Sequence, residues 1–267
     1  MKLLLSSLVF LTSILTPFVD LSAKIIETRH FNEIIGYADY DNVLIILDID
    51  DTLLVPVQTL GTDVWFRDRI NVHQREGMAF ENAIAKTIIE WEAIRHLTKV
   101  KIVEEGIEKN IQAMQKNNVH IMGLTTQSLT LTTCTTQQLL SLGINLFNTA
   151  PSRENYYFMN GQGVLYTQGI LFTNGTDKGK ALFSYLDHIG YLPKFIVFIN
   201  DKETHLKEVE KEVLPRAVEF IGLRYSYSDS RVDSYDSRIS DLQWKYSTLS
   251  NILSDDEAKA LIKADKS

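Results

Sequence analysis

The stretch VLIILDIDDTLL, from Val43 to Leu54, decides how this chain is interpreted. Its apolar first half is typical of a buried strand and ends at Asp48 and Asp50. A strand that stops at two carboxylates carries them to the end of a sheet, where they are costly unless a cation or a substrate compensates them. Alternate residues of an extended chain share one side, so Asp48 and Asp50 point the same way. The pattern predicts metal-assisted phosphoryl transfer, with Asp48 as the nucleophile and Asp50 giving and taking the proton.

Two simpler interpretations of the acidic pair compete with this one. A calcium loop of the EF-hand type also opens with Asp-x-Asp, but it requires Gly at its sixth position and Glu at its twelfth. Leu53 and Thr59 stand there instead, which excludes that loop. The other interpretation is a solvated acidic turn that follows a strand. Asp51, which would point away from the pair, is itself interpreted as a turn or capping residue.

Further apolar segments predict the rest of a parallel sheet. Strands are expected at Val119–Leu124, Phe195–Ile199 and Ala217–Leu223. None of them alternates cleanly, as expected of parallel strands that are covered on both faces. An apolar stripe at helical spacing between Val103 and Met114 predicts the crossover helix that a parallel sheet requires. Strand-like runs that alternate with amphipathic segments indicate the α/β class.

The segment 55–102 adds a second helix that the crossover does not need. An apolar stripe at helical spacing marks this helix and consists of Phe80, Ile84, Ile88 and Trp91. We interpret 55–102 as a helical insert that lies over the carboxylate end of the sheet. Apolar stripes of this kind pack against other elements far more often than they contact a ligand, so no chemistry is assigned to this one.

Two residues near other element ends are candidates for binding a phosphate. Thr125 follows the second predicted strand, where its hydroxyl can donate to a phosphoryl oxygen. Lys178 precedes a predicted helix over 181–190, so its ammonium and the helix N-terminus could face the same anion. Lys180 competes with Lys178 for that role.

An acidic residue after the third predicted strand is a candidate metal ligand. Asp201 follows Asn200 there, and it would complete an oxygen-rich Mg²⁺ site with Asp48 and the Asp50 carbonyl. The competing interpretations are a helix cap and a plain turn. Asn200 is a further candidate ligand.

Four short segments together resemble a known superfamily. LDIDDTL, LTTQ, DKGKAL and FINDK, in this order, are similar to motifs one to four of the haloacid dehalogenase superfamily, in its phosphatase branch. The resemblance covers 41–223, and the first motif is the most specific. The stretch Leu60–Phe66 also resembles an uncharacterised haloacid-dehalogenase-like family of intracellular bacteria. The resemblance implies a Rossmann-like parallel sheet, with 24–54 and 103–267 as the core and 55–102 as a helical cap inserted after the first catalytic strand.

The resemblance also implies an activity and assigns a role to each motif. The protein would be a Mg²⁺-dependent phosphomonoester hydrolase that acts on a small phosphorylated substrate. Asp48 would form the aspartyl-phosphate, and Asp50 would be the general acid and then the base for the hydrolytic water. Thr125 and Lys178 would hold the phosphoryl group. Asp48, Asp50 and Asp201 would bind Mg²⁺.

One departure from the family pattern supports an alternative. Asn200 stands where motif four often has an acid, and His205 stands where a spaced Asp could be. A single acid would weaken metal binding, so the alternative is a binding or effector protein on an inherited phosphatase scaffold. A phosphorylation-receiver domain fits less well, because it places its phosphorylated Asp on a later strand than its acidic pair.

Composition and the N-terminal segment bear on partners and location. The chain has 267 residues, a net charge of -7 and a pI near 5.4, which argues against nucleic acid as a partner. A basic start followed by the apolar stretch Leu3–Val19 predicts a signal peptide over 1–23, cleaved after Ala23, or else an uncleaved anchor. We therefore expect a periplasmic or secreted protein, with no stable membrane partner unless that segment is retained. Cys134 is the only cysteine, which excludes an intrachain disulfide.

Overall fold

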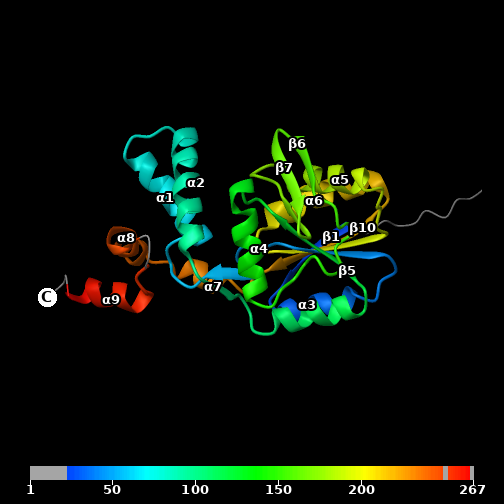
Figure 1. Cartoon of the computed structure of the whole chain (residues 1–267), viewed down its shortest axis with the longest axis horizontal. Coiled ribbons are helices and arrows are strands. Elements are labelled where there is room, and N and C mark those ends of the chain that lie inside the picture. The colour runs from blue at the N-terminus through cyan, green and yellow to red at the C-terminus, as the bar shows by residue number, and fades with distance from the viewer. Residues whose placement is uncertain (1–22, 249–251, 265–267) are drawn as a thin grey trace, which may run out of the picture.

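The computed structural model describes residues 23–248 and 252–264, which are arranged around one central sheet (Figure 1). Within these residues the sheet has eight strands in the order β1-β10-β9-β2-β5-β8-β7-β6. The strands are β1 (Ala23–Thr28), β2 (Val43–Leu47), β5 (His120–Thr125), β6 (Tyr156–Asn160), β7 (Gln162–Thr167), β8 (Ile170–Phe172), β9 (Phe195–Asn200) and β10 (Glu219–Tyr225).

The pairing of these strands is mostly parallel. In the order given, the six strands β1, β10, β9, β2, β5 and β8 are each parallel to their neighbours. β7 then pairs with β8 in antiparallel fashion, and β6 pairs with β7 in the same way. The predicted α/β fold with a parallel sheet is confirmed, and the four predicted strands correspond to β2, β5, β9 and β10. Because β2 lies between β5 and β9, the carboxyl ends of these three strands meet at one edge of the sheet.

Helices cover both faces of the sheet, and β2 shows how its sequence divides between them. Leu44 and Ile46 face one core cluster, while Ile45 and Leu47 face the other, as the alternation of side chains along a strand requires. The first cluster is closed by α5 (Lys178–His188) and α6 (Glu203–Val213), which leads into the short helix η3 (Leu214–Arg216). The second is closed by η1 (Phe31–Tyr37), α3 (Ile107–Lys116) and, after η2 (Leu129–Leu131), α4 (Thr132–Ser141).

The insert that the sequence predicts after the first catalytic strand consists of two helices on a short ribbon. The strands β3 (Leu54–Pro56) and β4 (Val100–Ile102) pair in antiparallel fashion, and α1 (Asp63–Arg75) and α2 (Phe80–Leu97) lie between them in the sequence. Figure 1 shows α1 and α2 standing beside the layer formed by the sheet rather than on one of its faces.

The C-terminal helices lie beside this insert, although we expected residues after 103 to belong to the core. They are α7 (Asp229–Asp233), α8 (Ser237–Tyr246) and α9 (Asp255–Ala264), and Figure 1 shows α8 below α1, with α9 below α8. Gln243 accepts a hydrogen bond from the backbone N–H of Leu60 at 2.9 Å. Asp255 accepts from the backbone N–H and the hydroxyl of Thr59 at 3.1 and 2.9 Å. These contacts join the C-terminal helices to the start of the insert.

The N-terminal prediction falls almost entirely outside the described residues. Of the predicted signal peptide 1–23, only Ala23 is described, and it is the first residue of β1. No helix among the described residues is long and apolar enough to cross a membrane.

Candidate active site

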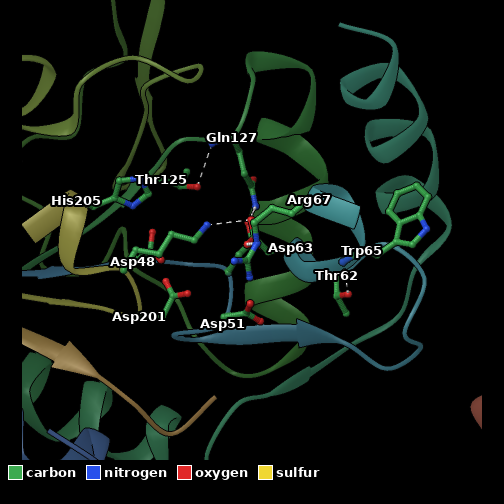
Figure 2. Close-up of polar contacts among 12 residues, drawn as sticks. Asp48, Asp51, Thr62, Asp63, Trp65, Arg67, Thr125, Gln127, Asp201 and His205 are labelled. Carbon is green, nitrogen blue, oxygen red and sulfur yellow. Dashed lines mark hydrogen bonds and ion pairs between the residues drawn. The ribbon is translucent and has the colours of Figure 1, made fainter. Parts of the chain in front are cut away.

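The site is built at the edge where β2, β5 and β9 end. Asp48 follows β2, Thr125 is the last residue of β5, and Asp201 follows β9. The backbone N–H of Asp48 donates to the carbonyl of Ile199 at 3.1 Å, so the ends of β2 and β9 are held together. Figure 2 shows the side chains of Asp48, Thr125 and Asp201 gathered at this edge. The structure thus brings together residues from three of the four sequence motifs.

Lys178 comes from the third motif, DKGKAL, and pairs directly with the predicted nucleophile. Its Nζ lies 2.5 Å from Oδ1 of Asp48, and its side chain is fully buried. The Lys178 ammonium also lies 5.5 Å from the centre of the Phe198 ring. Its competitor Lys180 is exposed to solvent, and the backbone N–H of Lys180 donates to the capping residue Asp177. The geometry therefore favours Lys178 over Lys180 as the cation of the site.

Close packing of two helices fixes the position of Lys178. It is the first residue of α5, and its backbone N–H donates to Oε2 of Glu208 on α6 at 2.8 Å. The next residue, Gly179, has no room for a side chain, because an added Cβ would lie 2.1 Å from the backbone oxygen of Glu208. A glycine at this point lets α5 approach α6 and directs the lysine toward Asp48.

Asp48 and Asp201 place two carboxylates beside each other. Burial raises the pKa of Asp201 well above its ordinary value, and the negative charge of Asp48 raises it further. Thr52 lies between their chain segments, since its hydroxyl donates to Oδ2 of Asp48 at 3.4 Å and accepts from the backbone N–H of Asp201 at 3.2 Å. A buried carboxylate that interacts with a half-buried one is a candidate site for a divalent cation.

Asp50, the third predicted metal ligand, does not join Asp48 and Asp201 through its side chain. Within residues 23–248 and 252–264, no group of three or more acidic, histidine or cysteine side chains converges as a metal site. The carboxylate of Asp50 is bound elsewhere, because Nη1 of Arg95 donates to its Oδ1 at 2.6 Å and Nε2 of Gln127 donates to its Oδ2 at 2.7 Å. The side chain of Asp50 is thus held by Arg95 and Gln127, and the atom of Asp50 that was predicted to bind the cation is its carbonyl oxygen.

The partners of Asp50 were not predicted from the sequence. Arg95 comes from the last turn of α2 and is only 1% exposed, and its second terminal nitrogen donates to Gln138 at 3.2 Å. Gln127 is held by the hydroxyl of Thr135, which donates to its Oε1 at 2.5 Å. Gln127 lies within the LTTQ motif, so its position was visible in the sequence, whereas nothing in the sequence marks Arg95.

Thr125, for which a phosphate-binding role was predicted, is buried at the end of β5. It is 2% exposed, and its Oγ1 accepts a hydrogen bond from the backbone N–H of Gln127 at 3.2 Å. A hydroxyl has one proton to donate in addition to its acceptor sites, so Thr125 can still donate to a phosphoryl oxygen.

Asn200, the further candidate metal ligand, is engaged in the turn that leads into α6. It is fully buried, and its Oδ1 accepts from the backbone N–H of Lys202 at 2.7 Å. Its amide nitrogen lies 3.5 Å from Nδ1 of His205. Burial, together with the charges of Lys178 and Lys202, lowers the pKa of His205 to about 2, so this imidazole is neutral. Asn200 thus holds the loop through its side chain.

Asp51 anchors the loop on the other side, as the sequence suggested for a turn residue. Its backbone has a positive φ of 61°, and its carbonyl accepts from the hydroxyl of Ser228 at 2.7 Å. Its carboxylate forms an ion pair with Arg231 of α7. Burial raises the pKa of Asp51 to about 6 despite the opposing charge of Arg231.

A cleft of about 320 Å³ opens over these residues. Asp48, Asp50 and Thr125 lie at its base, and side chains of α1 and α2 form part of its wall. Lys202 Nζ lies 2.9 Å from Oδ1 of Asp63, the first residue of α1, so an ion pair joins the insert to the core at the cleft. The cleft thus brings the carboxylates of Asp48 and Asp50, the hydroxyl of Thr125 and the ammonium of Lys202 to one concave surface.

These features define the class of protein: an α/β protein with a parallel sheet, an acid–lysine pair at one edge and a helical insert beside it. Residues 27–259 match the family described as "Protein of unknown function (DUF2608)", and the chain belongs to that family.

Similar proteins are found in three species of Chlamydia, and their names describe them as candidate outer membrane proteins. One protein from Chlamydia pneumoniae is 28% identical over 244 residues, which is 91% of each chain. Those from Chlamydia muridarum and Chlamydia trachomatis are 25% and 24% identical, and the matches cover 93% and 87% of this chain and 94% and 89% of the relatives.

Solved structures of two hydrolases are similar at low identity. A haloacid dehalogenase-like hydrolase from Bacteroides fragilis is 12% identical, and the match covers 68% of this chain and 87% of that one. A HAD-superfamily hydrolase from Geobacter sulfurreducens is 13% identical, with 72% and 96% covered. Both have a TM-score of 0.39.

Proposed function

We propose that this protein is a Mg²⁺-dependent phosphomonoester hydrolase that works through an aspartyl-phosphate intermediate. The observation that carries the proposal is the pairing of Asp48 with the buried Lys178 at a strand end. In-line phosphoryl transfer needs a nucleophile, a proton donor and positive groups for the phosphoryl oxygens. Asp48, Asp50 and Lys178 supply one of each, and Thr125 adds a hydroxyl donor.

The chemistry follows in two balanced steps. In the first, a carboxylate oxygen of Asp48 attacks phosphorus, the bond from phosphorus to the ester oxygen breaks, and Asp50 gives that oxygen its proton. In the second, Asp50 takes a proton from water as the water oxygen attacks the same phosphorus. The bond between phosphorus and Asp48 then breaks, which releases inorganic phosphate and regenerates the carboxylate. Lys178 and Thr125 stabilise the phosphoryl oxygens in both steps.

The residues present fit a Mg²⁺ ion. Mg²⁺ is usually bound by one or two carboxylates, with water and substrate oxygens completing its shell. Asp48 and Asp201 would be those carboxylates, and the carbonyl of Asp50 is a further candidate. Asn200 is a weaker one, because its Oδ1 already accepts a backbone hydrogen bond. When bound, the cation would neutralise charge on the phosphoryl oxygens.

We also propose that the protein is exported and acts on a small phosphorylated substrate. The apolar N-terminal stretch supports export, and so do the names of the Chlamydia relatives. The net charge of -7 gives no support to a nucleic-acid partner. Whether the segment 1–23 is cleaved or retained as an anchor decides between a free and a membrane-bound protein.

A second candidate function is phosphate binding without turnover. Two observations favour it: Arg95 engages the carboxylate of Asp50, and Asn200 replaces an acid in motif four. Both changes would weaken catalysis and leave the pocket around Asp48 able to bind an anion.

Hydrolysis of p-nitrophenyl phosphate with Mg²⁺ or with EDTA tests the proposal. We expect turnover only with Mg²⁺, and Asp48→Asn should lower kcat by about a thousandfold or more. The control is Asp256→Asn, an exposed acid of α9, which should leave kcat unchanged. Full turnover by Asp48→Asn would show that the nucleophile is assigned wrongly. No turnover by the wild type, with phosphate still bound, would favour the second function.

A second experiment looks for the intermediate itself. Asp50→Asn removes the base for the hydrolytic water, so the phosphorylated enzyme should accumulate with a good leaving group. Mass spectrometry of rapidly quenched protein should find one phosphoryl group on the peptide that contains Asp48. Absence of that adduct in a variant that still releases p-nitrophenol would contradict the covalent mechanism.

A further inference from the structure

The apolar stripe of α2 lies in a different place from the one expected. The stripe Phe80, Ile84, Ile88, Trp91 was assigned to packing, but Ile84, Ile88 and Trp91 line the cleft and Phe80 is 51% exposed. The residues of α2 that are buried are Ala83, Thr87, Ile94 and Arg95. Trp91 also packs against the small core cluster formed by Leu60, Trp65, Ile94 and Ile252. Core packing therefore accounts for Trp91 and for the buried side of α2, but it does not account for Ile84 and Ile88 on the side toward the cleft.

This apolar wall faces the reactive groups across the same cavity. Phe66 of α1 lies with its ring 5.8 Å from that of Trp91, edge to face, and extends the wall. At 1.5 Å per helical residue, Ile84 and Trp91 lie about 10 Å apart along α2. A ligand whose phosphate sits at Asp48 would thus have the rest of its structure against a hydrocarbon surface of that length.

The charges around the wall disfavour a second anionic group. The lysine that lines the cleft, Lys202, is already paired with Asp63. Arg95 and Lys178 do not line the cleft, and both are paired with carboxylates of the site. Glu92 adds a further negative charge to the lining. Among the described lining residues, no unpaired lysine or arginine is left to bind a second phosphate or a carboxylate.

We propose that the site selects phosphomonoesters whose leaving group is uncharged and apolar, over nucleotides, bisphosphates and polar sugar phosphates. The proposal rests on the function proposed above and names its substrate class. Ile84 and Ile88 are the specificity-determining residues, because they present aliphatic surface to the leaving group. An apolar group that is buried there gains affinity in proportion to the area it removes from water.

Binding of n-alkylphosphonates tests this selectivity without requiring turnover. Methyl-, butyl- and octylphosphonate are titrated into the full-length protein with Mg²⁺ by calorimetry. We expect each added methylene that reaches the wall to tighten binding, by up to about fourfold. 3-Phosphonopropionate, which ends in a carboxylate, should bind more weakly than butylphosphonate.

Two substitutions in α2 test whether the side chains that line the cleft, rather than α2 in general, cause the dependence on chain length. Ile88→Ser should remove most of the dependence on chain length, because Ile88 lines the cleft. Ile89→Ser is the matched control, since Ile89 is 70% exposed and does not line it, and it should keep the wild-type dependence. Ile84→Ser is a second test variant, in case Ile88→Ser does not fold.

The outcomes distinguish this proposal from the function on which it rests. Affinity that is independent of chain length, or tighter binding of 3-phosphonopropionate than of butylphosphonate, overturns the selectivity whether or not esters are hydrolysed. A chain-length dependence that Ile88→Ser and Ile89→Ser affect equally overturns the assignment of the wall. Chain-length dependence without hydrolysis of any ester supports the apolar ligand class and overturns only the hydrolase function.

Discussion

Removal of the buried lysine is the sharpest test of the electrostatics of this site. Lys178→Met keeps a side chain of similar length and removes the ammonium that lies 2.5 Å from Asp48. Lys178 is fully buried and Asp48 is 6% exposed, so water can replace little of the lost attraction. Removing one partner of a buried ion pair costs about 3–5 kcal/mol. We expect the free energy of unfolding, measured with EDTA, to fall by that amount.

The neighbouring carboxylate makes the effect asymmetric. Lys178→Met leaves Asp48 beside Asp201, with the repulsion between the two acids undiminished. Asp48→Asn leaves the lysine without its partner but removes that repulsion, so it should cost less than Lys178→Met. The double variant should cost about 2 kcal/mol less than the sum of the single ones, because it leaves no member of the pair alone in the interior.

Urea unfolding followed by circular dichroism measures these differences. Millimolar Mg²⁺ should restore part of the stability that Lys178→Met loses, since a divalent cation compensates both carboxylates. Lys180→Met is the control, because Lys180 is exposed on the same helix, and its effect should stay within about 0.5 kcal/mol. A loss below about 1 kcal/mol for Lys178→Met, or one equal to that of Lys180→Met, refutes the reasoning.

Three other changes probe the surroundings of the site. Arg95→Lys should lower kcat/KM for an aryl phosphate about tenfold, because an ammonium cannot reproduce the planar contacts that orient Asp50. An unchanged kcat/KM would show that the orientation of Asp50 by Arg95 does not matter. Gly179→Ala should cost about 1–3 kcal/mol in thermal unfolding, since its Cβ would meet the backbone of Glu208, and an unaltered Tm would contradict the close approach of the helices. Burial alone would raise the pKa of Glu104, but the hydrogen bonds that it accepts lower it below its ordinary value of 4.5. Ionised Glu104 therefore stabilises the fold above that pH and loses the effect in acid. Glu104→Gln should have a lower free energy of unfolding than the wild type at pH 7, and this difference should narrow below pH 4.5. A difference that stays constant with pH would contradict the argument.

The strand ends and their acids were predictable because their signal is local. An apolar run followed by Asp48 specifies both a buried strand and what lies at its tip. The same holds for Thr125 and Asp201, and parallel pairing then brings all three to one edge. β1 was not predicted, and its first residue, Ala23, falls at the end of the predicted signal peptide.

The contact of Arg95 with Asp50 could not be predicted from local sequence patterns. Its partner Asp50 lies 45 residues earlier, and neither spacing nor residue type connects them. The C-terminal helices were placed with the core for a similar reason. Gln243 meets Leu60 across 183 residues, a contact that depends on how the chain returns to the insert.

The apolar stripe on α2 shows which structural features helical spacing can predict and which it cannot. Helical spacing correctly indicated that Ile84 and Ile88 share a side of one helix. It did not indicate what that side faces, because an apolar surface is satisfied equally by a core or by an apolar ligand. The buried side carries Ala83 and Thr87, which are small or polar and give a weak signal in the sequence.

The position of α2 links two properties of the site that would otherwise be independent. Its last turn supplies Arg95, which orients Asp50, and its earlier turns supply Ile84 and Ile88, which line the cleft. The pair of Asp48 and Lys178, by contrast, belongs to β2 and α5 and needs no residue of the insert. A change that shifts α2 as a whole should therefore alter the proposed proton transfer and substrate binding together, while leaving Asp48 and Lys178 in place.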